Sequence, residues 1–175
     1  MKKSILALVM TAVLISCTTA PCPEATPKAI GHEVSDDGVK IPLYSGDLSN
    51  VAIWEKYIVA HNERDLETIK SLNAAEGFKA YAPTGQIIDG TDAHIAFLTA
   101  WFADANPKWK TSYLIENEFT TKKGELRQWV TSGHSVTLTA EGQEVKLGQV
   151  HDALIVDGKV QMFYVTQRIL AADEL

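Results

Sequence analysis

The spacing of hydrophobic residues divides the chain into three parts. Residues 4–15 form a mainly apolar run, residues 47–105 repeat apolar side chains every three or four positions, and residues 109–170 alternate apolar with polar. Repeats of three to four are typical of amphipathic helices, and alternation is typical of half-buried strands. The pattern therefore predicts an α+β fold whose helices precede its main sheet.

Three helices and two short strands are expected in the middle part. Trp54, Tyr57, Ile58 and His61 share one helical face, behind a cap at Ser49 or Asn50. The further elements expected are a helix capped by Asp65, strands over 78–81 and 86–89, and a helix over 91–105 capped by Thr91. That last helix is apolar around most of its circumference, which indicates burial.

Four long strands should follow, over residues 109–120, 125–139, 144–156 and 159–170. Their connections Lys123-Gly124, Glu141-Gly142 and Asp157-Gly158 are typical of two-residue hairpin turns. Such turns fix the register, because facing residues must pair outward from each turn. His134 then lies opposite Tyr113 and Gln149, and His151 lies opposite Ser132 and Tyr164. A β-bulge would shift every pair beyond it and exchange the faces.

This register also separates an apolar face from a mainly polar one. The polar face still carries apolar residues at one end: Val150, Leu154, Val156, Phe163, Val165 and Ile169. Exposed apolar patches commonly mark an interface, so we expect a homodimer through this convex sheet face.

Several short motifs resemble one superfamily in their order and spacing. They are Tyr57, Ala60, Asn62 and Asp65 in the first helix, Pro83-Thr84-Gly85 and Gly90 before the third, and Asp157-Gly158-Lys159-Val160 before the last strand. The chain over residues 48–170 resembles the nuclear-transport-factor-like (NTF2-like, SnoaL-like) superfamily. The resemblance implies a cystatin-like α+β cone, in which a curved, mainly antiparallel sheet wraps three helices around a cavity. Ketosteroid isomerases, polyketide cyclases, scytalone dehydratases, limonene epoxide hydrolases and non-enzymatic binding domains share that fold, so fold alone does not decide function.

The predicted register places polar groups among apolar ones inside the cone, a pattern typical of small-molecule sites. His134 and His151 are candidate general bases, because histidine titrates near neutral pH, and Tyr113 and Tyr164 are candidate hydrogen-bond donors beside them. Candidate ligand contacts are Tyr57, His61, Trp101, Asn117, Ser132, Gln149 and Thr166. The alternative for each is a hydrogen-bonded core residue.

Three functions stay open at this point. The first is a domain that binds a small, partly apolar ligand. The second is an isomerase, dehydratase or hydrolase with a histidine base and tyrosine donors; against it, the superfamily's enzymes rely on an inward carboxylate, whereas the register turns Asp152 and Glu116 outward. The third is a protein-interaction domain with a filled cavity. No motif indicates a cofactor or a metal site.

The amino-terminal sequence indicates the cellular location of the protein. Lys2 and Lys3 precede the apolar run, which is too short to span a bilayer, and Leu14-Ile15-Ser16-Cys17 resembles the lipobox of bacterial lipoproteins. The resemblance implies cleavage after residue 16, acylation of Cys17 and a membrane anchor in the cell envelope, most simply the outer membrane because Thr18 follows. Residues 17–46, rich in proline and glycine, should form a flexible tether with a short strand near residues 39–43, and residues 47–175 the domain.

Composition and net charge exclude several classes of protein and of binding partner. Residues are 46% hydrophobic and 22% charged, which excludes a disordered chain and a polytopic membrane protein. The formal charge is -6, and loss of Lys2 and Lys3 makes it -8. A surplus of acid argues against nucleic acid as a partner. Cys22 is left without a second cysteine in the mature chain, so no disulfide framework is expected.

Overall fold

The computed structural model describes residues 27–171 and 174. The lipobox and its Cys17 lie outside the described residues. The elements in chain order are β1 (Gly31–Val34), β2 (Lys40–Leu43), α1 (Leu48–Glu63), α2 (Leu66–Leu72), β3 (Lys79–Tyr81), β4 (Ile87–Asp89), α3 (Thr91–Ala105), β5 (Lys108–Thr120), β6 (Leu126–Ala140), β7 (Gln143–Val156) and β8 (Lys159–Ile169).

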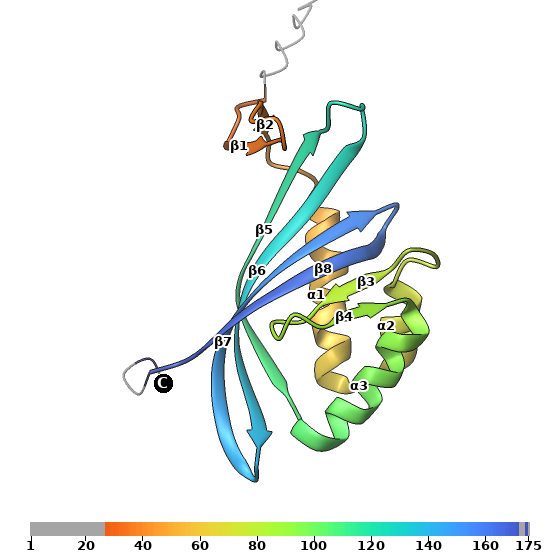
Figure 1. The fold of residues 1–175 in the computed structure, drawn as a ribbon, viewed down its shortest axis with the longest axis vertical. Helices are drawn as coiled ribbons and strands as arrows, with labels where there is room; N and C mark the ends of the chain where they lie inside the picture. Colours follow the sequence, from red (N-terminus) through yellow and green to blue (C-terminus); the bar gives the residue numbers. More distant parts are fainter. Residues whose placement is uncertain (1–26, 172–173, 175) are drawn as a thin grey trace, which may run out of the picture.

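Six strands form one curved sheet, and the three helices cover one of its faces (Figure 1). The strand order is β4-β3-β8-β7-β6-β5, and every neighbouring pair is antiparallel except β3 with β8. This is the α+β cone of NTF2-like proteins that the sequence predicted. The four long strands are a meander, as expected from their closely spaced turns.

The helices begin where a side chain or a turn satisfies their first amides. Asp47 caps α1 and accepts a hydrogen bond from the Ser49 amide at 2.8 Å, so the helix starts earlier than predicted. Asp65 caps α2 as predicted, with the Thr68 amide at 2.9 Å. Thr91 does not cap α3, because Gly90 precedes it at the cap with a φ of 92° and no side chain.

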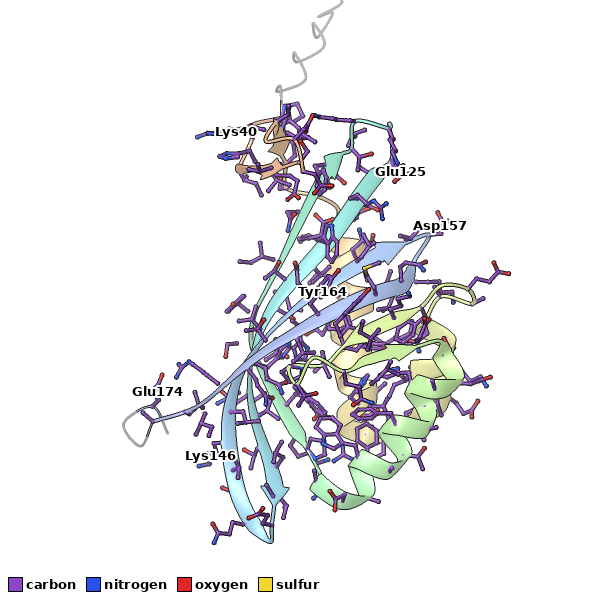
Figure 2. The ribbon with its side chains drawn as sticks, viewed as in Figure 1. Lys40, Glu125, Lys146, Asp157, Tyr164 and Glu174 are labelled. Carbon is purple, nitrogen blue, oxygen red and sulfur yellow. The ribbon has the colours of Figure 1, made fainter. Side chains whose placement is uncertain are left out.

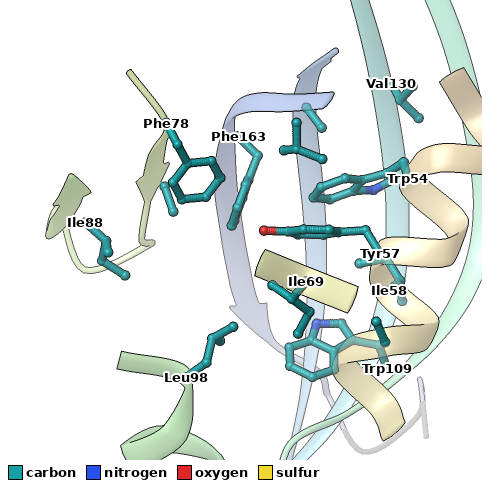
Figure 3. Packing of buried hydrophobic residues seen from close by; sticks show 14 of the residues in the cluster. Trp54, Tyr57, Ile58, Ile69, Phe78, Ile88, Leu98, Trp109, Val130 and Phe163 are labelled. Carbon is teal, nitrogen blue, oxygen red and sulfur yellow. The ribbon is translucent and has the colours of Figure 1, made fainter. Parts of the chain in front are cut away.

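Aromatic side chains fill the space between α1 and the sheet. Trp54 and Tyr57 project from α1 with their rings stacked, centroids 5.0 Å apart, and Phe163 of β8 packs against Trp54 at 5.4 Å (Figure 3). Trp54 and Tyr57 are fully buried, which secures α1 to the sheet by several kcal/mol of apolar burial.

Two of the three predicted hairpin turns are confirmed. Glu141-Gly142 and Asp157-Gly158 connect their strands as two-residue turns, with all four residues at positive φ. The register between β6 and β7 is therefore the predicted one along its whole length. The turn at Lys123-Gly124 was wrong: the last pair is Thr120 with Leu126, so five residues form the loop and the register shifts by one.

Two bulges change which side chains face the helices. Ser112 is an extra residue on β5, between the pairs Thr111–His134 and Tyr113–Gly133. Gln161 is an extra residue on β8, between the pairs that join Val160 and Met162 to β7. Because successive side chains alternate between faces, each inserted residue exchanges the faces of the residues beyond it.

A short antiparallel hairpin, β1–β2, lies within the range expected to be tether. Strand β2 confirms the short strand expected near residues 39–43, and its partner β1 was not predicted. Tyr44 then pairs with Glu118 of β5 through two backbone hydrogen bonds of 2.9 Å. Figure 1 shows the hairpin beside the β5–β6 loop, and the Lys122 ammonium contacts the Asp37 carboxylate there.

Candidate functional site

A cavity of about 110 Å³ lies between the sheet and the helices. Its walls are mainly apolar and aromatic. The lining residues are Trp54, Ile58, His61, Ala80, Ala82, Pro83, Ile88, His94, Phe97, Leu98, Trp101, Trp109, Gln149, His151, Phe163, Val165 and Gln167. Pro83 and Gln167 are exposed at the surface as well, so the cavity opens to solvent between them.

No aspartate, glutamate, lysine or arginine lines this cavity. Its polar groups are three histidines and two glutamines. The remaining walls include Trp101, which packs against Trp109 with ring centroids 5.5 Å apart, and Phe97, which stacks on Trp101 at 5.8 Å. An apolar cavity with a few polar groups is the usual form of a small-molecule site.

His134 is buried in the sheet with both ring nitrogens engaged. Nδ1 lies 3.1 Å from the Thr111 hydroxyl, and Nε2 lies 2.8 Å from the Ser132 hydroxyl. Ser132 also accepts a hydrogen bond of 2.8 Å from Trp54 Nε1. With both nitrogens occupied, His134 has no nitrogen free for a ligand, and it does not line the cavity.

His151, its neighbour on β7, is held by Gln149. Its Nε2 lies 2.9 Å from Gln149 Oε1, which also accepts a hydrogen bond of 3.1 Å from Trp109 Nε1. Because that oxygen can only accept, Nε2 carries the proton and Nδ1 is the unprotonated nitrogen. Nδ1 has no partner and is sealed from the cavity.

His61 reaches the cavity from the last turn of α1. Its Nδ1 donates to the Tyr57 carbonyl oxygen one turn earlier, at 2.7 Å, which leaves Nε2 unprotonated. Aromatic rings surround it: the centroid of Tyr57 is 4.6 Å away, that of Trp109 5.7 Å and that of Phe102 6.0 Å.

His94 enters the cavity from the first turn of α3. Its Nδ1 is 3.3 Å from Asn73 Nδ2 and 3.4 Å from the Tyr57 hydroxyl, which itself donates to Asn73 Oδ1 at 2.6 Å. The ring also packs on Phe78, with centroids 5.0 Å apart. His94 is not among the site residues predicted from the sequence. Its spacing with Leu98 and Phe102 was the signal that it faces inward.

The four buried histidines described above are neutral at physiological pH. Each is at most 5% exposed. Burial disfavours the charged ring, and it lowers the pKa of His61 and His134 to about 4 and that of His94 to about 3. Burial also holds the pKa of His151 well below its usual range, and repulsion from His134 adds to the effect.

The five-residue β5–β6 loop and the bulge in β8 place several predicted site residues outside the cavity. Tyr113 and Tyr164, expected beside the histidines, lie on the convex face and are 44% and 42% exposed; Tyr164 is labelled in Figure 2. Asn117 and Thr166 share that face. In their place the bulge in β8 turns Phe163, Val165 and Gln167 inward, residues that a strand without a bulge hides from sequence reasoning.

Other predicted contacts do meet at the cavity. His61, Trp101, Gln149 and His151 line it. Tyr57 and Ser132 are buried beside it without lining it. Phe163 and Val165 face inward and do not belong to the convex apolar patch, whereas the exposed Ile115 lies on that face. The homodimer expected through it stays a prediction.

One buried carboxylate was assigned to the wrong face. Glu116 was expected on the convex side, but the shifted register of β5 turns it toward α1, where Asn50 Nδ2 lies 3.4 Å from one oxygen and the other has no partner. Burial raises the pKa of Glu116. It is not among the residues that line the cavity. Asp152 stays on the convex face as predicted, bonded to the Thr131 hydroxyl at 2.7 Å.

Neither metal-site geometry nor a spanning helix is found in the part of the chain that the structure describes. Over residues 27–171 and 174, no three histidine, cysteine or acidic side chains gather as metal ligands would. None of the helices in this range has both the length and the apolar character needed to cross a bilayer.

The comparisons with known proteins rest on structure alone. No protein-family model matches the chain. No curated protein matches its sequence. Among solved structures, a candidate ketosteroid isomerase from Kribbella flavida DSM 17836 superposes with a TM-score of 0.56 and 19% identity, over 73% of this chain and 83% of that one.

Two further structures cover other functions. An LEH-like epoxide hydrolase from M. tuberculosis has a TM-score of 0.56 and 12% identity, over 69% of this chain and 83% of its own. An NTF2-like protein of unknown function from Burkholderia pseudomallei has a TM-score of 0.52 and 20% identity, over 71% and 93%. The chain therefore has the NTF2-like fold, which enzymes and proteins without a known activity share.

Proposed function

We propose that the domain binds a small, uncharged and mainly apolar molecule in the cavity between the sheet and the helices. The observation that carries this proposal is the lining itself. It combines aromatic walls with a few polar atoms and contains no charged side chain. An ionised ligand would lose its hydration there without meeting an opposite charge, which makes its binding costly.

Size supports a ligand built on one ring. The enclosed space is about 110 Å³. For comparison, an apolar cavity of about 150 Å³ in another protein holds benzene. Because the mouth lies between Pro83 and Gln167, substituents of a bound ring can extend toward solvent.

Binding is favoured over catalysis by the same geometry. The acid–base pairs expected from the sequence need a tyrosine beside each sheet histidine, but Tyr113 and Tyr164 lie on the opposite face. His134 has both nitrogens occupied. A histidine whose pKa is near 4 is also a weak base, since general bases work best with a pKa near the operating pH.

A matched pair of ligands tests the proposal. We expect toluene to bind and benzoate of similar size not to bind, measured by titration calorimetry or ligand-observed NMR at pH 7. Ala82 lines the cavity near its mouth, so Ala82→Trp should fill the space and abolish toluene binding. Ala103→Trp, on the exposed side of α3, is the control and should leave binding unchanged. Equal binding of toluene to Ala82→Trp and Ala103→Trp would refute the site.

We also propose that the domain is held at a bacterial membrane through a lipid on Cys17. The lipobox-like Leu14-Ile15-Ser16-Cys17 and the apolar run before it support this proposal. The first described residue, Pro27, lies ten positions after Cys17 and leads into β1. More than one acyl chain would be needed for stable anchoring.

Membrane fractionation tests the anchor. Cys17→Ala should release the protein from the membrane fraction and remove the mass of the lipid in intact-mass spectrometry. Cys22→Ala changes the other cysteine and should do neither. A Cys17→Ala protein that stays in the membrane fraction would contradict the anchor, whatever the outcome of the ligand experiments.

A further inference from the structure

His61 and His94 present complementary hydrogen-bonding atoms to the same cavity. The Tyr57 carbonyl oxygen fixes the hydrogen of His61 on Nδ1, so Nε2 is an acceptor. Carbonyl oxygens only accept, and the bond of 2.7 Å lies within one helix, so this tautomer follows from the backbone.

The opposite tautomer follows for His94. Asn73 Oδ1 receives the Tyr57 hydroxyl hydrogen at 2.6 Å, so the amide nitrogen of Asn73 is the atom that faces His94 Nδ1. An amide nitrogen only donates, which makes Nδ1 of His94 the acceptor and places the ring hydrogen on Nε2. His94 therefore offers a donor where His61 offers an acceptor.

Both Nε2 atoms are open. Neither has a hydrogen-bond partner among the described residues, and neither is sealed from the cavity as Nδ1 of His151 is. The two rings are 6.0 Å apart between centroids. Hydrogen bonds of this kind span about 2.8–3.0 Å, so one oxygen bonds both nitrogens where they lie within about 6 Å of each other, a spacing that this ring separation allows. His61 and His94 are 5% and 2% exposed, so either nitrogen left without a partner carries a desolvation cost.

We propose that the ligand carries a hydroxyl group that donates to His61 Nε2 and accepts from His94 Nε2–H. A hydroxyl is the smallest group that can do both. This inference rests on the proposed function and specifies its ligand: a phenol or an alcohol with an apolar body. An ether or a ketone satisfies His94 alone, and a hydrocarbon satisfies neither.

Phenol and toluene, which have nearly the same shape, separate this inference from general hydrophobic binding. Toluene is the more apolar, so affinity that followed hydrophobicity alone would favour it. Two hydrogen bonds to otherwise unpaired nitrogens should instead make phenol bind about tenfold tighter to the wild-type protein at pH 7. His61→Phe should remove most of that preference, and His32→Phe, which replaces an exposed histidine of β1 outside the cavity, should keep it.

The tautomers give a second measurement that does not depend on a substitution. In spectra of protein labelled with 15N-histidine, Nε2 of His61 should have the shift of an unprotonated nitrogen and Nε2 of His94 that of a protonated one. Phenol should move both signals, and toluene should leave them nearly in place.

The outcomes are distinct. Equal or weaker binding of phenol relative to toluene overturns the hydroxyl inference and leaves the cavity as a ligand site. The same tautomer at both histidines also overturns it. Failure of both compounds to bind refutes the proposed function together with the inference.

Discussion

Two pairs of buried histidines lie close together in this fold, yet they differ in which ring nitrogens a ligand can reach. In the sheet pair, His134 and His151, the ring centroids are 4.5 Å apart. Their nitrogens are hydrogen-bonded within the sheet, except Nδ1 of His151, which is buried without a partner. In the helix pair, His61 and His94, one nitrogen of each ring is bonded and the other is open to the cavity.

The difference shows that burial of a titratable ring does not by itself make a site. All four rings have a lowered pKa for the same reason, desolvation. Only the helix pair has unsatisfied nitrogens that a ligand can reach. The sheet pair therefore stabilises the fold, and the helix pair is the part of the cavity that can recognise a polar group.

Acidification should produce the largest effect, and it should affect both pairs alike. Unfolded histidines bind protons below their ordinary pKa of about 6.5, but the folded rings do so only near 4 or 3. The free energy of unfolding should therefore fall as the pH drops below 6.5. At pH 5 the free energy of unfolding should be lower by about 2 kcal/mol for each of His61, His94 and His134. Together these losses are a large part of the stability of a typical domain.

Urea unfolding at pH 7, 6 and 5 measures this loss. His61→Phe and His134→Phe should each reduce the difference between pH 7 and pH 5 by about one quarter, because each removes one of the four buried titrating rings. A free energy of unfolding that is the same at pH 5 as at pH 7 would show that the histidines do not stay neutral in the folded state.

The second effect separates the pairs. At pH 7, His134→Phe should destabilise the protein by about 2–3 kcal/mol, because it removes two hydrogen bonds and leaves the buried Ser132 hydroxyl with one partner fewer. His61→Phe should cost about 1 kcal/mol or less, because it loses one bond to a helix carbonyl and its ring borders open space. Equal losses in urea unfolding would remove the distinction between sealed and open rings.

The smallest effect concerns the other sealed polar atom, Glu116 Oε2. Burial raises the pKa of Glu116, so ionisation of this carboxyl group lowers the free energy of unfolding above that pKa. Acidification should therefore stabilise the protein through Glu116, whereas it destabilises the protein through the histidines. Glu116→Gln should raise the free energy of unfolding by at most about 1 kcal/mol at pH 7. Glu63→Gln, on the exposed side of α1, should leave it unchanged. A loss of stability in Glu116→Gln would show that the carboxylate is favourably solvated.

Much of the fold could be predicted from local pattern. The helical face of Trp54, Tyr57 and His61 and the alternation after Pro107 are direct consequences of side-chain geometry, and the structure confirms the elements they predicted. Both residues of the turns Glu141-Gly142 and Asp157-Gly158 adopt positive φ, as expected of two-residue turns. The first turn predicted the whole pairing of β6 with β7 correctly, and the second predicted the pairing of β7 with β8 as far as Val160.

The candidate site could be predicted only in part, because a bulge has no strong local signal. Ser112 and Gln161 are ordinary strand residues in the sequence, and nothing next to either of them marks an irregularity. His151 and Gln149 precede any shift on their strand and were placed correctly. Tyr164 lies beyond the extra residue on β8, and Tyr113 follows from a β5–β6 loop that is longer than the expected turn, so neither was placed correctly.

Gln161 also shows how strand pairing, as well as residue identity, sets the chemistry of this interior. With Gln161 held in a bulge, β8 contributes a phenyl ring, an isopropyl group and an amide to the cavity, through Phe163, Val165 and Gln167. The same strand paired without the bulge would present Tyr164, Thr166 and Arg168 at those places: a phenol, an alcohol and a cation. One unpaired residue thus replaces a charged lining by a nearly neutral one, a change that would otherwise take three substitutions.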